Sequence, residues 1–300
     1  MSPIASPIAA HAIWNRCPGT ARGVVLLAGS LGSDATMWQP QIAALTPDVD
    51  VLRIEHRGHG ASPSTPGPYD LDDLTDDVLA VLDREGVEDV TMVGLSIGGM
   101  IAINCALRAP HRFPRLVLLC TSAHLGPASA WQERAARVRA QGPGVIAADV
   151  VSRWFTAAYA QAHPDDVQRM IDMIAATDPE GYAGCCEAIA AMDLRPRLPH
   201  LHSQVLAIPG AQDRTTPPEH LHQICDAVPT AHLVTVPGAH LASWENADEV
   251  NRLIREHLNL PADLPADLPA DPPAVDQKQS REQSQEVAPP RPAQTHPGQL

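Results

Sequence analysis

Residues 90–100 read Val-Thr-Met-Val-Gly-Leu-Ser-Ile-Gly-Gly-Met, and this stretch decides which fold the rest of the chain must build. Its first four residues predict a buried strand, and the residues from Gly99 onward predict a helix. Between them lies the pattern Gly-x-Ser-x-Gly, with Ser96 at its centre. A strand, a sharp turn and a helix in this order lift the serine hydroxyl to the edge of the sheet where the strand ends, and the glycines leave room for the turn. Ser96 is therefore the predicted nucleophile.

The chain on both sides of this stretch alternates between short apolar runs and helical patterns. The expected strands are Gly23–Ala28, Val51–Ile54, Val90–Gly94, Leu116–Leu119, Gln204–Ile208 and His232–Val236. The expected helices are Met37–Leu45, Leu71–Arg84, Gly99–Arg108, Pro218–Ala227 and Ala247–Leu258. Strands that are apolar along their whole length are typical of a sheet covered on both faces. The alternation predicts an α/β fold with a mostly parallel, doubly wound sheet.

Residues 122–202 interrupt this alternation, because they contain helical patterns and no convincing strand pattern. The helices expected there lie near Ala130–Arg139, Val145–Phe155, Pro164–Ala175 and Pro179–Ala190. We predict a helical cap inserted after the sixth strand, over a core made of residues 1–121 and 203–259. After Leu260 the sequence repeats Pro-Ala-Asp-Leu and then becomes rich in Gln, Ser, Glu and Pro. Residues 260–300 are accordingly predicted to be a disordered tail or linker.

Composition excludes several classes of partner. The formal net charge is −14 and no basic stripe is present, which disfavours binding to nucleic acid or to an anionic membrane. No apolar run approaches the roughly 20 residues that span a bilayer, and the N-terminus lacks the pattern of a signal peptide. The six scattered cysteines contain no Cys-x-x-Cys pair and suit free thiols in a reducing compartment, so the expected location is the cytoplasm. Because the net charge is negative, an anionic substrate would need an arginine side chain close to its binding site.

Two further residues complete a catalytic constellation with Ser96. A serine hydroxyl needs a base, and the base needs an acid that orients it. Asp213 follows the expected strand Gln204–Ile208, and His240 follows the next expected strand in Pro-Gly-Ala-His. The order serine, acid, histidine suits this sheet, and both loops lie at the edge where such sheets bind ligands. We predict a triad of Ser96, Asp213 and His240.

The oxyanion of a tetrahedral intermediate needs two hydrogen-bond donors. The backbone N–H of Ile97, just after the nucleophile, is one predicted donor, and that of Leu31, in the loop after the first core strand, is the other. The histidine pairs at 200/202 and 220/222 lack the spacing of a metal site, so no metal is expected. Arg57-Gly58-His59-Gly60 is interpreted as a structural turn. No nucleotide fingerprint is present, and no cofactor is expected.

Beyond these residues the chain resembles the 3-oxoadipate enol-lactonases, a branch of the α/β-hydrolase fold, over about residues 12–258. The segments shared with many hydrolases are Ser30-Leu31-Gly32-Ser33 with Met37-Trp38, His56-Arg57-Gly58-His59-Gly60, and Gly94 to Gly99. The more specific segments lie in the cap and are Arg153-Trp154-Phe155-Thr156, His163-Pro164, Glu180-Gly181-Tyr182, Cys185-Cys186 and Met192-Asp193-Leu194. One departure is Gly29, where the family often has Asn or His. Another is the proline-rich C-terminal segment, which stands where some relatives carry a decarboxylase domain, so no decarboxylase activity is expected.

The resemblance implies hydrolysis of the enol-lactone to 3-oxoadipate, through an acyl-enzyme on Ser96, in protocatechuate and catechol degradation. The expected partner is thus a small-molecule lactone that carries a carboxylate. For its recognition we predict Trp154, which would cover the lactone ring, together with Arg153 or Arg57 as the carboxylate's cation. A related carboxylesterase or lactonase with another acyl group stays open as an alternative, as does a ligand-binding protein that has lost turnover. The sequence leaves the oligomeric state undecided.

Overall fold

The computed structural model describes residues 7–261, and its centre is one sheet with the strand order β1-β3-β2-β4-β5-β6-β7. The strands are β1 (Ala12–Asn15), β2 (Val24–Ala28), β3 (Asp50–Ile54), β4 (Thr91–Leu95), β5 (Arg115–Leu119), β6 (Gln204–Ile208) and β7 (Ala231–Leu233). β1 is antiparallel to β3, and every other pair is parallel. The predicted α/β architecture with a mostly parallel sheet is confirmed.

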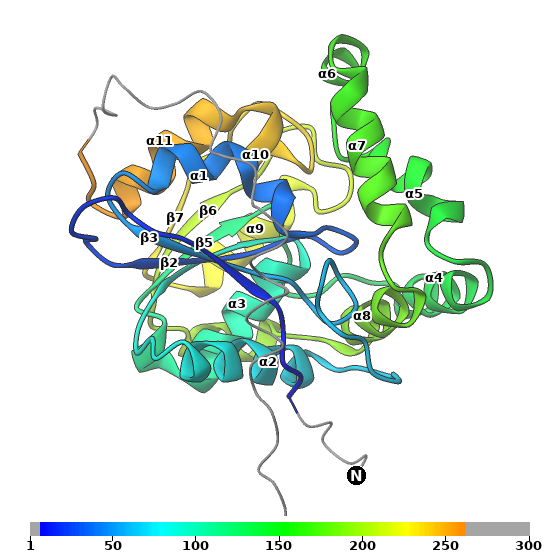
Figure 1. The fold of residues 1–300 in the computed structure, drawn as a ribbon, viewed down its shortest axis with the longest axis horizontal. Helices are drawn as coiled ribbons and strands as arrows, with labels where there is room; N and C mark the ends of the chain where they lie inside the picture. The colour runs from blue at the N-terminus through cyan, green and yellow to red at the C-terminus, as the bar shows by residue number, and fades with distance from the viewer. Residues whose placement is uncertain (1–6, 262–300) are drawn as a thin grey trace, which may run out of the picture. The chain divides into compact units, whose positions relative to one another are not determined.

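Helices cover both faces of this sheet, which explains why its strands are apolar throughout. The core helices are α1 (Gln39–Leu45), α2 (Leu71–Arg84), α3 (Ile97–Arg108), α9 (Pro218–Ala227), α10 (Ala242–Glu245) and α11 (Ala247–His257), with short 3-10 helices at Ala35–Trp38 and Pro110–Arg112. Figure 1 shows α1 and α11 on one face of the sheet and α2 and α3 on the other. Asp70 and Asp73 bond reciprocally to each other's backbone N–H, and this capping box begins α2 at the predicted residue.

The chain between β5 and β6 is the predicted helical insertion. It consists of α4 (Ala128–Gln141), α5 (Gly144–Val151), α6 (Ala157–Ala162), α7 (Pro164–Ala175), α8 (Pro179–Ala191) and a 3-10 helix at Arg195–His200. Figure 1 shows α4 to α8 gathered to the right of the sheet. These helices and the core belong to one compact unit. The insertion is called the cap below.

Several boundaries differ from the prediction. The cap follows β5, which is the fifth strand along the described chain and not the sixth. The expected helix over 145–155 ends at Val151, because the chain turns there and the Trp154 N–H bonds to the Val151 carbonyl at 2.9 Å. β1, α6 and α10 had no expected counterpart.

The end of the folded chain also lies slightly later than predicted. Leu260 is 9% exposed and its N–H donates to the Arg255 carbonyl at 2.9 Å, so residue 260 packs on the core. The remainder of the predicted tail 260–300, residues 262–300, lies outside the described residues. No helix within 7–261 combines the length and the apolar character that crossing a membrane requires.

Candidate active site

Ser96 lies between β4 and α3 in a strained backbone conformation. Its φ of 58° and ψ of −119° belong to a region that residues with a side chain rarely adopt. A Cβ added at Gly98 would lie 2.0 Å from the Ala28 carbonyl oxygen, and one added at Gly94 would lie 2.3 Å from the Gly98 oxygen. Only glycine fits at either position. The predicted turn therefore forms, and it presents Ser96 at the carboxyl edge of the sheet.

Asp213 and His240 meet at the same edge. His240 Nδ1 donates a hydrogen bond to Asp213 Oδ2 at 2.8 Å, and both side chains are buried. The other carboxylate oxygen accepts the N–H groups of Thr215 and Thr216 at 2.7 and 3.1 Å, and the Thr216 hydroxyl donates to Oδ2 at 2.7 Å. Burial by itself raises the pKa of Asp213, but the His240 charge and these hydrogen bonds outweigh it and hold that pKa below its ordinary value. The carboxylate is thus ionised and can orient the imidazole.

A cysteine thiol lies close to this pair. Cys120, which follows β5 with a φ of 42°, accepts the Gly210 N–H at Sγ over 3.3 Å. Burial, followed by the charge of Asp213, raises the pKa of this thiol well above its ordinary value, so it remains protonated. The sequence alone does not single out Cys120 or Thr216, because only the approach of separate loops brings them to Asp213.

Cys120, Asp213 and His240 also form a possible metal-binding cluster, since their ligand atoms lie within 4.8 Å of one another. Two ligand atoms on one tetrahedral zinc ion stand about 3.3 Å apart, given metal–ligand bonds near 2.0 Å. The 2.8 Å between Asp213 and His240 is instead the length of a hydrogen bond. The short distance between Asp213 and His240 therefore suits a proton shared in a hydrogen bond better than a bound metal ion.

The loop after β2 contacts the Ser96 turn, as the oxyanion prediction requires. The Gly98 N–H donates to the Gly29 carbonyl at 3.2 Å, which ties the two segments together. The Gly32 N–H is occupied, because it donates to His59 Nε2 at 2.9 Å. Within residues 7–261, by contrast, the N–H groups of Leu31 and Ile97 are bonded to no acceptor. Both predicted donors are therefore available to a ligand.

Two buried histidines hold this loop in place. His59 Nδ1 donates to the Arg57 carbonyl at 2.8 Å, which leaves Nε2 without a proton and able to accept from Gly32. His56 Nε2 donates to the Gly29 carbonyl at 3.0 Å. Burial, reinforced by the charge of His56, lowers the pKa of His59 from 6.5 to about 4, and burial lowers that of His56 as well. Both rings are neutral at pH 7. The structural role expected for the turn containing His59 thus includes support of the oxyanion loop.

The cap residues predicted to contact the substrate occupy different environments. Trp154 is only 2% exposed, and its backbone carbonyl accepts the Leu241 N–H, next to His240, at 2.8 Å. Arg153 lines a cavity of about 720 Å³ between the cap and the loop that carries Asp213. Its guanidinium is paired with Asp149 at 3.0 Å. The structure thus places both residues close to the candidate site.

The structure contradicts the prediction that Arg57 could receive the substrate's carboxylate. Its side chain is completely buried. Nε donates to Asp77 Oδ2 at 2.5 Å and Nη2 donates to Oδ1 at 2.9 Å, which forms a two-pronged ion pair. Nη2 also donates to the Asp73 carbonyl at 3.2 Å. Binding a substrate would break this buried pair and leave Asp77 uncompensated, so Arg57 is a structural residue.

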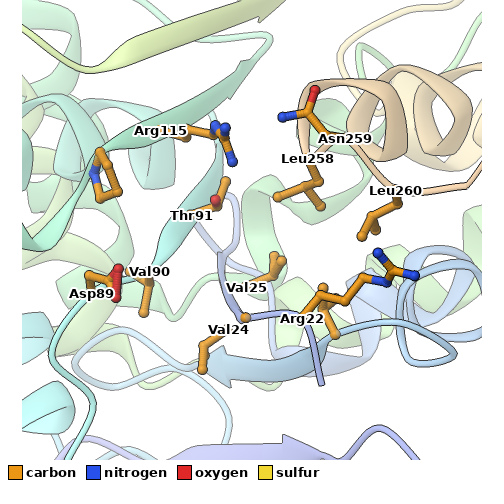
Figure 2. A pocket seen from close by; sticks show the side chains of 13 residues that line it. Arg22, Val24, Val25, Asp89, Val90, Thr91, Arg115, Leu258, Asn259 and Leu260 are labelled. Carbon is orange, nitrogen blue, oxygen red and sulfur yellow. The ribbon is translucent and has the colours of Figure 1, made fainter. Parts of the chain in front are cut away.

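A second cavity, of about 270 Å³, lies at the opposite edge of the sheet. Figure 2 shows it between the residues where strands begin, among them Val24, Thr91 and Arg115, and the end of the last helix at Leu258. Ser96, Asp213 and His240 all follow the ends of their strands. This cavity is therefore separate from the candidate active site.

Comparison with known proteins identifies the class. Residues 24–253 match the model of the alpha/beta hydrolase family, and the chain belongs to that family. It is a hydrolase. Its similarity to 3-oxoadipate enol-lactonase 2 of Acinetobacter baylyi is 40% identity over 195 residues, which cover 65% of this chain and 73% of that protein.

Two solved structures are similar to this chain in both sequence and fold. The enol-lactonase from Burkholderia xenovorans LB400 is 35% identical with a TM-score of 0.82, and the match covers 86% of this chain and all of that chain. A hydrolase from Pseudomonas aeruginosa PA01 is 37% identical with a TM-score of 0.79, covering 82% and 93% of the two chains. The resemblance to the 3-oxoadipate enol-lactonases that the sequence indicated is confirmed.

Proposed function

We propose that this protein is a serine hydrolase that opens the enol-lactone of 3-oxoadipate to give 3-oxoadipate. The observation that carries the proposal is the 2.8 Å hydrogen bond between His240 and an ionised, buried Asp213, at the sheet edge where the strained turn presents Ser96. This arrangement supplies a nucleophile, a base and an acid that fixes the base's tautomer. It favours turnover over simple binding, because a strained serine is retained at functional sites.

The reaction proceeds by two acyl transfers. His240 Nε2 takes the proton of Ser96 as Oγ attacks the lactone carbonyl, and the Leu31 and Ile97 amides stabilise the oxyanion. The ring C–O bond then breaks, and the enol oxygen leaves with the proton from His240 and tautomerises to a ketone. A water molecule, deprotonated by His240, attacks the acyl-enzyme and releases the carboxylic acid and the serine hydroxyl. An enol is a good leaving group, so the reaction needs little acid assistance.

The substrate assignment is supported by the names of the enol-lactonases to which the chain is similar. We place the reaction in protocatechuate and catechol degradation, the β-ketoadipate pathway, and we place the protein in the cytoplasm, where its six free thiols suit a reducing environment. The proposed partner is the small-molecule lactone, with no nucleic acid or membrane involved, and no cofactor takes part in the steps above.

Kinetics on two substrates test the proposal. Purified protein is given the enol-lactone and, separately, a neutral aryl ester, and we expect kcat/KM to be far higher for the enol-lactone. An organophosphonate probe should label the wild-type protein at Ser96 and leave the Ser96→Ala variant unlabelled. Preference for the aryl ester would favour a related carboxylesterase, and a protein that neither turns over nor is labelled would be a binding protein.

A further inference from the structure

A threonine from another part of the chain holds the backbone carbonyl of Ser96. The hydroxyl of Thr121, a completely buried residue, donates a hydrogen bond to this carbonyl oxygen at 2.6 Å. The same oxygen also accepts the N–H groups of Gly99 and Met100 at 3.0 and 3.2 Å. Those two bonds belong to the first turn of α3, so the threonine adds a third donor that the helix itself does not need.

Thr121 belongs to the segment that follows β5, and this segment holds Ser96 on both sides of its Cα atom. β5 is the neighbour of β4, the strand that leads into Ser96. The Ser96 N–H donates to the carbonyl of Leu119, the last residue of β5, at 3.0 Å. The Ser96 carbonyl accepts from Thr121 two residues farther along. These two bonds help to keep Ser96 in its strained conformation, which persists only where the surroundings enforce it.

The chain is locally shaped to admit this contact. A Cβ added at Gly99 would lie 2.7 Å from Cβ, Cγ2 and Oγ1 of Thr121, which is closer than real Cβ atoms approach. Gly99 therefore leaves the space through which the threonine reaches the carbonyl. The residue before Thr121 is Cys120, whose φ of 42° turns the chain out of the extended conformation of β5. Within residues 7–261 only three residues other than glycine have a positive φ, and Ser96 and Cys120 are two of them.

The carbonyl held by Thr121 belongs to the peptide group that carries a predicted oxyanion donor. The Ser96 carbonyl and the Ile97 N–H are the two ends of one trans peptide. Because this group is planar, its C=O and N–H bonds point in opposite directions and turn together. A rotation of the carbonyl therefore swings the Ile97 N–H, and a hydrogen bond weakens steeply when its donor is misaligned. The hydroxyl of Thr121 thus fixes the direction of an N–H group that it does not touch.

We propose that Thr121 is a positioning residue for the oxyanion site. Its hydroxyl holds the Ser96 carbonyl, and through the rigid peptide it aims the Ile97 N–H at the substrate oxygen that becomes negative. The inference rests on the proposed function, since it requires Ser96 as the nucleophile, but it applies to any ester or lactone that acylates this serine. A donor aimed at developing charge stabilises the transition state more than the bound substrate, so loss of Thr121 should lower kcat and spare KM.

Replacing Thr121 by valine keeps the branched shape and removes the hydroxyl. The variant should fold, because the Ser96 carbonyl keeps its bonds from Gly99 and Met100. Removing an oxyanion donor outright costs about 10²–10³-fold in kcat, and a misaligned donor should cost less. We expect kcat to fall about ten- to thirty-fold, with KM changed less than about two-fold, on the enol-lactone and on a neutral aryl ester alike. Thr121→Ser keeps the hydroxyl and should retain kcat within about three-fold.

An aryl trifluoromethyl ketone gives a readout that is specific to the oxyanion. Ser96 Oγ forms a bond to the ketone carbon, the carbonyl oxygen takes the electron pair of the broken π bond, and the serine proton passes to His240. The adduct carries the negative oxygen that the Ile97 N–H stabilises. The inhibition constant should therefore rise about ten-fold in Thr121→Val and stay near the wild-type value in Thr121→Ser.

A matched control separates this role from a general effect on stability. The hydroxyl of Thr75 is likewise completely buried and donates to a backbone carbonyl, that of Leu71, at 2.8 Å, but it lies in α2. Thr75→Val should lower the melting temperature, because it also removes a buried hydrogen bond. It should leave kcat and the inhibition constant of the ketone unchanged at a temperature where the protein is fully folded.

The outcomes for this inference and for the proposed function are distinguishable. A wild-type protein that hydrolyses the aryl ester but not the enol-lactone would refute the proposed substrate, yet a lower kcat of Thr121→Val on the aryl ester would still support the inference. If Thr121→Val lowers only the melting temperature, as Thr75→Val does, the hydroxyl is structural and the inference is overturned. A loss of kcat that persists in Thr121→Ser overturns it as well. Should the valine variant not fold, Thr121→Cys replaces it, and unchanged kcat with this weak donor overturns the inference.

Discussion

His59 gives the structure a pH dependence that can be calculated and measured. Its ring bridges two loops as a neutral acceptor for the Gly32 N–H, and it is completely buried. Burial and the neighbouring charge of His56 lower its pKa from 6.5 to about 4, so the unfolded chain binds the proton more readily than the folded one. Stability from this group is full above pH 6.5 and is lost as the pH falls toward 4.

The size of the effect follows from that pKa difference. At 1.36 kcal/mol per pH unit, the unfolding free energy should fall by about 2.5 kcal/mol between pH 7.5 and pH 4.5 because of His59 alone. Other groups titrate in the same range, so the contribution must be isolated by substitution. In His59→Gln the side-chain amide can donate to the Arg57 carbonyl and accept from Gly32, yet it does not titrate. Its pH dependence should therefore be smaller than that of the wild type by about 2.5 kcal/mol.

Equilibrium unfolding in urea at the two pH values measures this difference. His232→Gln, which changes an exposed histidine in β7, is the control and should behave like the wild type. If His59→Gln loses the same free energy as the wild type between pH 7.5 and pH 4.5, the interpretation of His59 as a neutral buried acceptor is wrong. His59→Ala should in addition lower kcat about ten-fold, because the loop carrying the Leu31 amide loses its anchor.

Five other substitutions test the site and its support. Ser96→Ala should reduce kcat by about 10⁴–10⁶-fold without loss of stability, and retention of more than a few per cent of the activity would refute its role. Ser96→Gly should be equally inactive but about 1 kcal/mol more stable to urea than Ser96→Ala, because glycine adopts the φ of 58° without strain. Asp213→Asn should lower kcat by about 10⁴-fold with an unchanged far-UV spectrum. Arg57→Met should destabilise the protein by about 3–5 kcal/mol, since it leaves Asp77 buried and unpaired; a loss below 1 kcal/mol would contradict this. Trp154→Phe should raise KM or lower kcat for the enol-lactone and spare an aryl ester, and equal effects on both would make Trp154 a packing residue.

The sequence predicted those elements whose determinants are local. The bounds of α2 agree because a capping box at Asp70 begins it and a glycine soon follows its end. β6 agrees because, after the exposed Gln204, its four remaining residues are apolar and buried. β1 was missed because it is a four-residue strand at the sheet edge, half-buried throughout, and its sequence Ala-Ile-Trp-Asn has no clear period.

In the candidate site, too, some features follow from the sequence and others depend on how separate elements pack. Asp213 and His240 follow successive strands, and the topology of a parallel sheet then brings them to one edge, so their pairing could be predicted. The ion pair of Arg57 with Asp77 could not, because it depends on how α2 packs against the loop after β3.

The cap also supports the proposed base, which changes how substitutions in it should be interpreted. The residues on either side of His240 are both tied to the cap: the Leu241 N–H donates to the Trp154 carbonyl at 2.8 Å, and the Ala239 N–H donates to Glu245 Oε2 at 3.1 Å. That same oxygen accepts the Thr156 N–H at 3.1 Å, and the Thr156 hydroxyl donates to the other oxygen of the Glu245 carboxylate. A displacement of the turn at 152–156 must therefore shift the imidazole. Trp154→Phe keeps the backbone carbonyl that holds Leu241, whereas changing Thr156 or Glu245 removes a side chain from the link. A loss of kcat in variants of Thr156 or Glu245 would therefore report on the position of His240, whereas Trp154→Phe tests the predicted contact between the Trp154 side chain and the substrate.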